Sequence, residues 1–247
     1  MLKLLLSAFA ILALAAGSSF SREEAKPIHL FILSGQSNMQ KLKPESSFLP
    51  EVRNLLSDDE VVHIKVAKGG QPIRLWVKEW NNIAAKHDID VKVYSTPYYD
   101  RILAQFKVLD AKYPQGFSSI SFNWMQGEQD AKEKLSVTYE ESLKTLIANL
   151  RRDLRAPHMN VVIGRLSDSR VGKQPEWEKI REILMKVATD DKHGAWVDTD
   201  DLNNKVRKGR LVNTVHYTKE GYELLGQRFA RQSVKLIKGE KPNPDGK

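Results

Sequence analysis

Residues 28–39 read IHLFILSGQSNM, and this stretch decides how the rest of the chain is interpreted. Its first half is apolar, β-branched or aromatic, and typical of a strand buried on both faces of a parallel sheet. It then changes abruptly to small and polar residues, so we expect a sharp turn at Gly35. Ligands of open α/β sheets bind beyond the carboxyl ends of the strands, which places Ser37 where a nucleophile would be useful. An ordinary strand-to-loop turn is the alternative interpretation.

Apolar runs and helical patterns alternate along the rest of the chain. Four further main strands are predicted at residues 61–67, 117–125, 159–164 and 195–198, with a small one at 91–94. Helices are predicted at 51–56, 76–87, 99–113, 139–154, 175–187 and 219–236, the last with Thr218 as its N-cap. Strands that alternate with helices and are joined by right-handed crossovers give a parallel sheet covered on both faces. The predicted fold class is therefore α/β, with a five-stranded parallel sheet in one domain.

Length and composition are those of a globular protein. The 247 residues suffice for one sizeable α/β domain, and 41% hydrophobic and 28% charged residues fit that class. The formal charge is +8, but the Lys and Arg residues are interleaved with 31 acids. Without a long basic run or an aromatic-basic motif, we interpret them as a solvated surface and expect no nucleic-acid partner.

The two ends of the chain differ in composition from the domain between them. Residues 1–19 resemble a secretory signal peptide, with Lys3 before an apolar core and small residues at 13–17. We expect a secreted or periplasmic protein without stable membrane insertion after cleavage, and a retained anchor is the alternative. The chain has no Cys, so its core must hold it without disulfides. Residues 20–27 are a predicted N-terminal tail, 28–238 the domain, and 239–247 a flexible tail.

Two other polar motifs can complete a site with Ser37. Residues 124–130 read WMQGEQD after the third main strand, and His216 lies just before the last helix. Ser37, Glu128 and His216 can supply the nucleophile, acid and base of acyl transfer. The GQSNM motif, then Gly69-Gly70, then the Gln-Gly-Glu-x-Asp motif and a late His together resemble the SGNH hydrolases. More narrowly, they resemble the sialic-acid-specific acetylesterase-like branch, which includes the acetylxylan esterases of carbohydrate esterase family six.

The resemblance covers roughly residues 28–236 and implies a three-layer, flavodoxin-like α/β/α sandwich. It implies a serine esterase that removes acetyl groups from carbohydrates, with no cofactor and no metal. Catalysis would use Ser37, Glu128 and His216. The oxyanion would be bound by the backbone N–H groups of Ser37 and Gly70 and by the side-chain amide of Gln126.

Three further residues are expected to contact the substrate: Gln36, Asn38 and Trp76. Trp76 could form one wall of a sugar site, although a Trp at helical spacing is more often part of the core. The aspartates at 198, 200 and 201 follow the fifth main strand without the spacing of a calcium loop, so we predict no metal there.

Asn213 departs from the pattern of many SGNH hydrolases, which carry Asp three residues before the catalytic His. An amide cannot stabilise an imidazolium as a carboxylate does. Either Glu128 supplies the carboxylate or turnover is poor. The alternative function is therefore a carbohydrate-binding or scaffolding protein that kept the esterase fold with little or no turnover.

Overall fold

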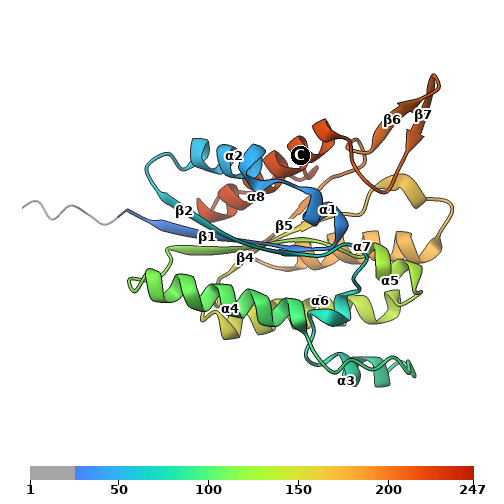
Figure 1. Ribbon diagram of the computed structural model, residues 1–247, viewed down its shortest axis with the longest axis horizontal. Coiled ribbons are helices and arrows are strands. Elements are labelled where there is room, and N and C mark those ends of the chain that lie inside the picture. The colour runs from blue at the N-terminus through green and yellow to red at the C-terminus, as the bar shows by residue number, and fades with distance from the viewer. Residues whose placement is uncertain (1–25) are drawn as a thin grey trace, which may run out of the picture.

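Five parallel strands form the central sheet, in the order β2-β1-β3-β4-β5 (Figure 1). The strands are β1 (Ile28–Gly35), β2 (Glu60–Ala67), β3 (Ser119–Met125), β4 (Asn160–Gly164) and β5 (Gly194–Val197). All eight residues of β1 are buried, as expected for a central parallel strand flanked by two neighbours. The structure is a computed structural model that describes residues 26–247, apart from the side chains of Arg207 and Leu211. The predicted signal peptide and most of the predicted N-terminal tail lie outside these residues.

Helices cover both faces of the sheet, which confirms the predicted three-layer α/β/α architecture (Figure 1). The α-helices are α1 (Ser37–Lys41), α2 (Phe48–Leu55), α3 (Trp80–Ala85), α4 (Pro97–Lys112), α5 (Glu128–Lys132), α6 (Ser136–Asp153), α7 (Pro175–Asp190) and α8 (Lys219–Ile237). The 3₁₀ turns are η1 (Pro44–Ser46), η2 (Ile73–Leu75) and η3 (Asp168–Arg170). Helices α2 and α8 pack together on one face, and α4, α6 and α7 lie on the other.

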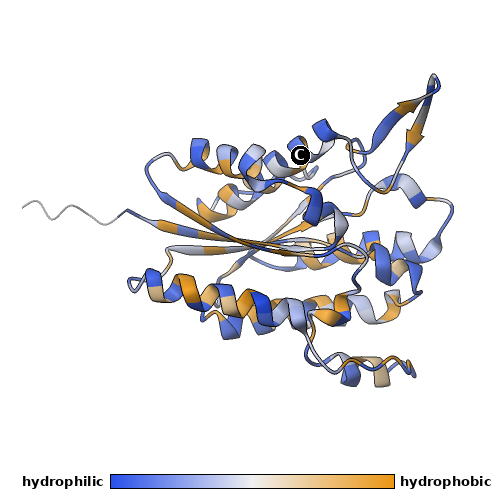
Figure 2. Cartoon of the chain, viewed as in Figure 1, coloured by the Kyte–Doolittle hydropathy of each residue, from blue (hydrophilic) through white to orange (hydrophobic). Residues whose placement is uncertain are grey.

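The core lies between these layers. Apolar residues gather along the strands and on the helix faces that meet the sheet, while the outer helix faces are hydrophilic (Figure 2). Phe31 and Phe229, from β1 and α8, are fully buried on this core, as is Leu143 of α6. Burying each such side chain stabilises the fold by about 1.5–3 kcal/mol relative to exposure. The last helix begins as predicted, because the Thr218 hydroxyl accepts a hydrogen bond of 2.8 Å from the Gly221 amide.

Sharp turns end the two central strands. Gly35 has a φ of +140°, and a Cβ there would lie 2.0 Å from the main-chain oxygen of Met125 on the neighbouring strand. Gly127 has the same φ and follows β3, where a Cβ would lie 2.7 Å from the Ile180 side chain. Only glycine fits both positions, so each strand can turn at once into a short helix. The polar residues that follow the two strands are thereby brought to one edge of the sheet.

Several elements differ from the prediction. Residues 91–94 form no strand, the helix predicted from 76 to 87 is reduced to α3, and the short helices α1 and α5 were not predicted. An antiparallel ribbon of β6 (Asn204–Arg207) and β7 (Arg210–Asn213) was not predicted. Its strands are only four residues long and mostly polar, so they carry no hydrophobic alternation that sequence reasoning could detect.

The C-terminal tail folds back on the domain, so the prediction of a flexible tail at 239–247 is wrong. The Gln232 side chain bonds both the amide and the carbonyl of Asn243, at 2.8 and 3.0 Å. The Asp198 amide donates to the Gly246 carbonyl at 2.9 Å, and Gly246 is buried. Polar composition predicted solvation of this tail, but its backbone finds partners in β5 and α8 instead.

Candidate active site

Ser37 and His216 lie together at the carboxyl edge of the sheet. Ser37 is the first residue of α1, directly after the turn that ends β1, and is half-buried. The His216 Nε2 atom lies 3.0 Å from the Ser37 Oγ atom, within hydrogen-bond distance, although the two residues are 179 positions apart. This is the geometry that a hydroxyl nucleophile and its general base require.

The imidazole of His216 is kept in its neutral form. Partial burial lowers its pKa below the usual value of 6.5, and the positive charges of Lys41 and Lys205 lower it further. A neutral imidazole is the form that can accept the serine proton at neutral pH. The backbone of the loop is also fixed, since the Thr214 hydroxyl donates to the His216 carbonyl at 2.6 Å.

Glu128 begins α5 beside this pair, but it contacts His216 only indirectly. Its Oε1 atom accepts a hydrogen bond of 3.0 Å from the Asn38 amide, while its buried Oε2 atom has no partner among the described residues. Burial raises the pKa of the carboxyl group to about 7, with a smaller contribution from the charge of Asp130. No hydrogen bond joins Glu128 to His216 in the described part of the chain, so the acid role of Glu128 stays a prediction.

Asn38 is the group that joins the parts of this site. Its side-chain amide donates at 3.0 Å both to Glu128 and to the main-chain oxygen of Val215, the residue before His216. Its Oδ1 atom accepts a 2.9 Å hydrogen bond from the Tyr222 hydroxyl of α8. Asn38 is 1% exposed, so the expectation that it contacts substrate is wrong. It instead fixes the positions of α1, α5, α8 and the His216 loop relative to one another.

Sequence reasoning missed this role of Asn38 and the part that Tyr222 plays in it. The position of Asn38 next to Ser37 in the GQSNM motif was the available signal, but its partners come from segments 90 to 184 residues away.

Asp130 and Gln126 form a second buried polar cluster under the loops. Both Asp130 carboxylate oxygens accept hydrogen bonds from the Ile73 amide, at 3.0 and 3.2 Å, and Oδ2 also accepts one from Gln126. The Gln126 amide further donates to the Gln71 carbonyl at 3.1 Å and to Gln36 Oε1 at 3.2 Å. Burial raises the pKa of Asp130 to about 7. Asp130 therefore caps the turn after β2.

Gln126 has no hydrogen left for an oxyanion. Its amide group carries two hydrogens and already faces three acceptors, and the side chain is fully buried. The prediction that it completes the oxyanion hole is therefore wrong in this structure. The sequence placed the residue correctly at the end of β3, but it could not reveal that the amide points into the protein.

The Gly69-Gly70 turn lies against the nucleophile. A Cβ on Gly69 would lie 3.4 Å from the Ser37 Cβ, and the Gly69 amide donates to Gln40 Oε1 at 2.7 Å. Gly70 has a φ of +69° and open space where its Cβ would be. Its amide has no hydrogen-bond acceptor among the described residues. The role of the Gly70 and Ser37 amides as oxyanion donors stays a prediction, with open space for the ligand beside Gly70.

The other two predicted substrate contacts are also buried. Gln36 is 3% exposed, and its Oε1 atom accepts hydrogen bonds from Gln126 and from the Gln129 amide. Trp76 is fully buried, and its indole donates to Ser34 Oγ at 2.9 Å. Both side chains connect loops to strands and cannot form the wall of a sugar site. The core alternative for Trp76 is the correct one.

Asn213 ends β7 and points away from the imidazole. Its amide donates to Asp168 Oδ2 at 3.1 Å. The side chain therefore shapes the loop before His216 and has no hydrogen bond to the ring among residues 26–247.

The comparisons with known proteins agree with this geometry. The model of a carbohydrate esterase family, described as sialic acid-specific acetylesterase, matches residues 40–235. The chain belongs to this family of carbohydrate esterases. This confirms the predicted family and the class of carbohydrate O-acetylesterase. No curated protein sequence matches the chain.

Several solved structures share the fold of this esterase. A protein of Arabidopsis thaliana is 19% identical with a TM-score of 0.60, over 85% of this chain and 98% of that one. A carbohydrate acetylesterase from Xanthomonas citri is 15% identical with a TM-score of 0.60, over 87% of this chain and 57% of that one. NanS is 13% identical with a TM-score of 0.59, over 87% of this chain and all of NanS. These likenesses confirm the fold expected for an SGNH hydrolase.

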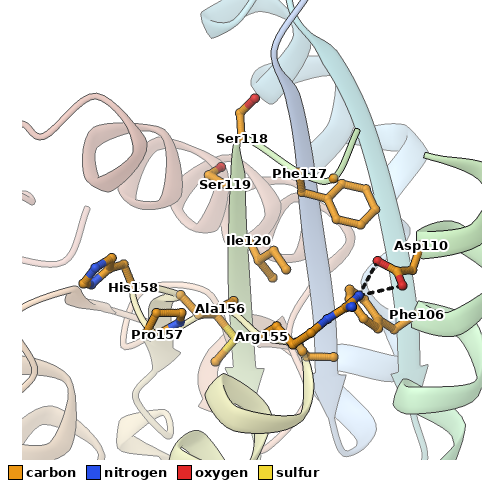
Figure 3. Close-up of a pocket in the computed structure, with 13 residues that line it drawn as sticks. Phe106, Asp110, Phe117, Ser118, Ser119, Ile120, Arg155, Ala156, Pro157 and His158 are labelled. Carbon is orange, nitrogen blue, oxygen red and sulfur yellow. Dashed lines mark hydrogen bonds and ion pairs between the residues drawn. The ribbon is translucent and has the colours of Figure 1, made fainter. Parts of the chain in front are cut away.

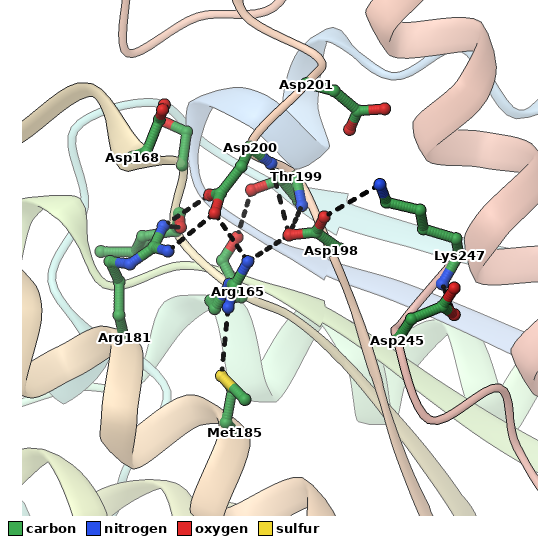
Figure 4. Close-up of polar contacts among 12 residues, drawn as sticks. Arg165, Asp168, Arg181, Met185, Asp198, Thr199, Asp200, Asp201, Asp245 and Lys247 are labelled. Carbon is green, nitrogen blue, oxygen red and sulfur yellow. Dashed lines mark hydrogen bonds and ion pairs between the residues drawn. The ribbon is translucent and has the colours of Figure 1, made fainter. Parts of the chain in front are cut away.

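The acidic residues after β5 of the esterase are held by arginines (Figure 4). Asp198 and Asp200 both contact Arg165, and Arg181 donates to Asp200 at 2.8 and 3.0 Å. Asp201 pairs with Arg228 at 2.6 Å. Among the described residues, no group of three or more acidic or His side chains is arranged to hold a metal ion. The resemblance to a metal cluster is therefore explained by ion pairs that fix the β5 loop.

A hollow of about 400 Å³ lies at the opposite edge of the sheet (Figure 3). It is lined by Phe106, Phe117 and Ile120, and an ion pair joins Arg155 to Asp110 at 2.7 Å. Its lining includes the first residues of β3, whereas Glu128 follows the end of that strand. The hollow is thus separate from the catalytic pair. None of the described helices is long and apolar enough to cross a membrane.

Proposed function

We propose that this esterase removes O-acetyl groups from carbohydrates by a serine acyl-enzyme mechanism. The single observation that carries the proposal is the 3.0 Å approach of His216 Nε2 to Ser37 Oγ at the carboxyl edge of the sheet. The lowered pKa of His216 supports it, because the imidazole is then ready to accept a proton.

In the first half of the reaction, His216 takes the Ser37 proton while Oγ attacks the acetyl carbonyl. The backbone amides of Ser37 and Gly70 stabilise the oxyanion that forms. The C–O bond to the sugar then breaks, and the imidazolium gives its proton to the departing sugar oxygen. In the second half, His216 activates a water molecule, which attacks the acetyl-Ser37 ester. Collapse of that intermediate returns the proton to Ser37 Oγ and releases acetate.

Glu128 is the proposed source of negative charge for the imidazolium. Its unpartnered Oε2 atom is buried on the element next to Ser37, and Asn38 links the carboxylate to the backbone before His216. Hydrogen bonds of catalytic groups often tighten only when substrate is bound. If Glu128 Oε2 moved to within hydrogen-bond distance of His216 Nδ1, the oxygen would gain a hydrogen-bond donor. The same contact would stabilise the positive charge of the imidazolium.

A serine-directed phosphonate tests the nucleophile directly. We expect one label per chain, on Ser37, detected by mass spectrometry of peptides. Ser37→Ala should abolish both labelling and p-nitrophenyl acetate hydrolysis, while Ser57→Ala, a control on the exposed turn before β2, should change neither. Labelling elsewhere with full activity of Ser37→Ala would disprove the mechanism.

Acyl size tests the acetylesterase assignment. Acetate esters should be cleaved much faster than octanoate esters, because an acetyl group needs only a small acyl pocket. A lipid esterase would show the opposite trend, since each methylene in a fitted apolar pocket favours binding by about 1–3 kcal/mol.

A second candidate function is carbohydrate binding without turnover. Asn213 favours it, because the residue occupies the position of the usual carboxylate and bonds Asp168 instead of His216. The two candidates differ in a simple measurement. The binding protein would retain acetylated polysaccharide without releasing acetate and without reacting at Ser37.

We also propose that the chain is exported. The positive charge of Lys3 before the apolar residues 4–16 supports cleavage near residues 17–19. N-terminal sequencing of exported protein should begin close to that point. Intact Met1 in a membrane fraction would indicate a retained anchor.

A further inference from the structure

No residue of the β6–β7 ribbon has a role in the catalytic mechanism proposed above. It is joined by a two-residue turn in which Lys208 and Gly209 have φ of 50° and 73°. The ribbon projects from the domain beyond the carboxyl edge of the sheet (Figure 1). Val206 on it is 75% exposed. A lone two-stranded ribbon gains little stability of its own, so a contribution to stability does not explain its presence.

The ribbon carries an unusual concentration of positive charge. Residues 205–210 read KVRKGR, with four cationic residues in six and no acid. Within residues 26–247, no acidic side chain forms an ion pair with Lys205, Lys208 or Arg210. The arginines that contact the loop after β5, in contrast, all have aspartate partners: Arg165, Arg181 and Arg228.

The base of the ribbon lies close to the catalytic pair. The ribbon ends at Asn213, three residues before His216, and the charge of Lys205 contributes to the lowered pKa of that imidazole. A polymer bound along the ribbon can therefore extend to the reacting ester.

A second cationic surface borders the same site. A groove of about 480 Å³ is lined by Lys41, Lys43 and Lys219, together with Ser46, Tyr222 and Glu223. Lys41 lies one helical turn after Ser37 on α1. The Tyr222 hydroxyl reaches Asn38, the neighbour of the nucleophile. The groove thus adjoins the catalytic residues from the side of α1 and α8.

We propose that the ribbon and the groove bind an acidic polysaccharide, one that carries repeated carboxylate or sulfate groups, and present its acetyl esters to Ser37. The ribbon and the groove both adjoin the catalytic pair, so an extended polymer can contact both surfaces while its acetyl ester lies at Ser37. Electrostatic complementarity of this kind raises the association rate and the specificity of binding. This inference rests on the proposed esterase function and names its substrate class.

A nucleic acid is the less favoured polyanion. The ribbon, from residue 204 to 213, contains no aromatic side chain on which bases could stack. A ligand on it is also held next to an ester-cleaving pair, which a polysaccharide can use and a nucleic acid cannot.

The test compares two double variants that remove the same amount of charge. Lys208→Gln/Arg210→Gln changes the ribbon and leaves the catalytic residues untouched. Lys107→Gln/Lys238→Gln is the matched control, because both lysines are exposed, one on α4 and the other just after α8. Helices α4 and α8 end at the far edge of the sheet, away from Ser37 (Figure 1). The substrates are acetylated pectin, an acetylated sulfated polysaccharide, a neutral acetylated glucomannan and O-acetyl sialic acid.

We expect the ribbon variant to raise KM for acetylated pectin or for the sulfated polymer at least about fivefold at low salt, with kcat unchanged. The effect should vanish near about 0.5 M salt, because the charges are then screened. Glucomannan, O-acetyl sialic acid and p-nitrophenyl acetate should be unaffected, and the control variant should behave as wild type. Comparing the carboxylated with the sulfated polymer identifies which anion is preferred.

Three results would overturn the inference: unchanged KM for both acidic polymers in the ribbon variant, equal losses in the control, or binding of DNA that the ribbon variant weakens while KM stays constant. All three leave p-nitrophenyl acetate hydrolysis by Ser37 intact, so the proposed function would stand. If wild type instead fails to hydrolyse any ester, binding of unacetylated pectin at low salt still tests the ribbon separately.

Discussion

Glu128 and Asp130 lie two residues apart on α5, and both are buried carboxyl groups whose pKa is raised to about 7. They differ in their hydrogen bonds. Asp130 accepts from the Ile73 amide with both oxygens and from Gln126 with one. Glu128 accepts from Asn38 alone and keeps one buried oxygen without a partner among the described residues.

The difference indicates that Asp130 stabilises the fold, whereas Glu128 has an oxygen free to take part in catalysis. A buried acceptor without a donor costs about 1–3 kcal/mol, so natural proteins rarely keep one without a use. Asp130 has no such atom, and its bonds connect the turns after β2 and β3. Glu128 keeps its free oxygen beside the loop of His216, where an imidazolium would supply the missing donor.

The largest effect is expected for Glu128→Gln. The amide keeps the shape and the acceptor for Asn38, but it cannot neutralise the imidazolium. We expect kcat to fall by about 10²- to 10⁴-fold, the range seen when an acid of a catalytic triad loses its charge. The melting temperature should stay the same or rise at pH 8, because a charge no longer has to be buried.

The matched control for that variant is Glu133→Gln, at the C-cap of the helix α5 that Glu128 begins. Glu133 pairs with Arg74 on the surface of the site and bonds Gln129, so its loss should alter kcat little. Full activity of Glu128→Gln would show that Glu128 is, like Asp130, a structural group.

Asp130→Asn should affect stability more than chemistry. The Asn side chain has one acceptor oxygen in place of two and turns an N–H group toward the Ile73 amide or the Gln126 amide. We expect a loss of about 2–4 kcal/mol in the free energy of unfolding, because buried donors are left without acceptors. Urea denaturation measures this loss. Folded protein at low temperature should keep most of its kcat, and a deep loss of kcat without loss of stability would reverse the comparison.

The pH profile distinguishes the two carboxylates in wild-type protein. Glu128 must be ionised to stabilise the imidazolium, and its pKa is about 7. Wild-type kcat/KM should therefore rise between about pH 6 and pH 8. The neutral form of His216 is needed as well, but its pKa lies below 6.5, so it sets a lower limb. Glu128→Gln should keep only that lower limb, and an unchanged profile would contradict the assignment.

The sequence predicted the architecture well because the strong signals were local. Each main strand is a short apolar run, and the alternation of strands with helices, joined by right-handed crossovers, gives a parallel sheet covered on both faces. The β6–β7 ribbon and the docked tail were missed because polar residues form both, the ribbon through backbone pairing and the tail through hydrogen bonds. Hydropathy carries no information about such contacts.

The sequence predicted where the site lies, but it predicted the orientations of only some of its side chains. Ser37 and His216 lie within hydrogen-bond distance of one another, since one follows a strand and the other precedes a helix at the same edge, whereas the contact predicted for Glu128 is only indirect. The directions of Gln36, Asn38 and Gln126 were not predictable, because each amide binds partners far away in the chain. A polar residue at a strand end can point to the ligand or into the protein, and only the packed loops decide which.

The smallest effect is expected at Asn213. This residue occupies the position at which many SGNH hydrolases carry the carboxylate that Glu128 is proposed to supply here. Asn213→Ala removes a hydrogen bond of 3.1 Å to Asp168 at an exposed position, which should lower kcat by about twofold at most. Asn213→Asp restores the residue that many relatives of this fold carry, but here it would face the Asp168 carboxylate. Like charges at that distance repel, so the new carboxylate should loosen the loop before His216 and add no activity while Glu128 supplies the charge. Steady-state kinetics of the single variants and of Glu128→Gln/Asn213→Asp measure this. A strong gain from Asn213→Asp together with a tolerated Glu128→Gln would mean that the wild-type protein is a decayed esterase, in which the carboxylate on α5 has only a structural role.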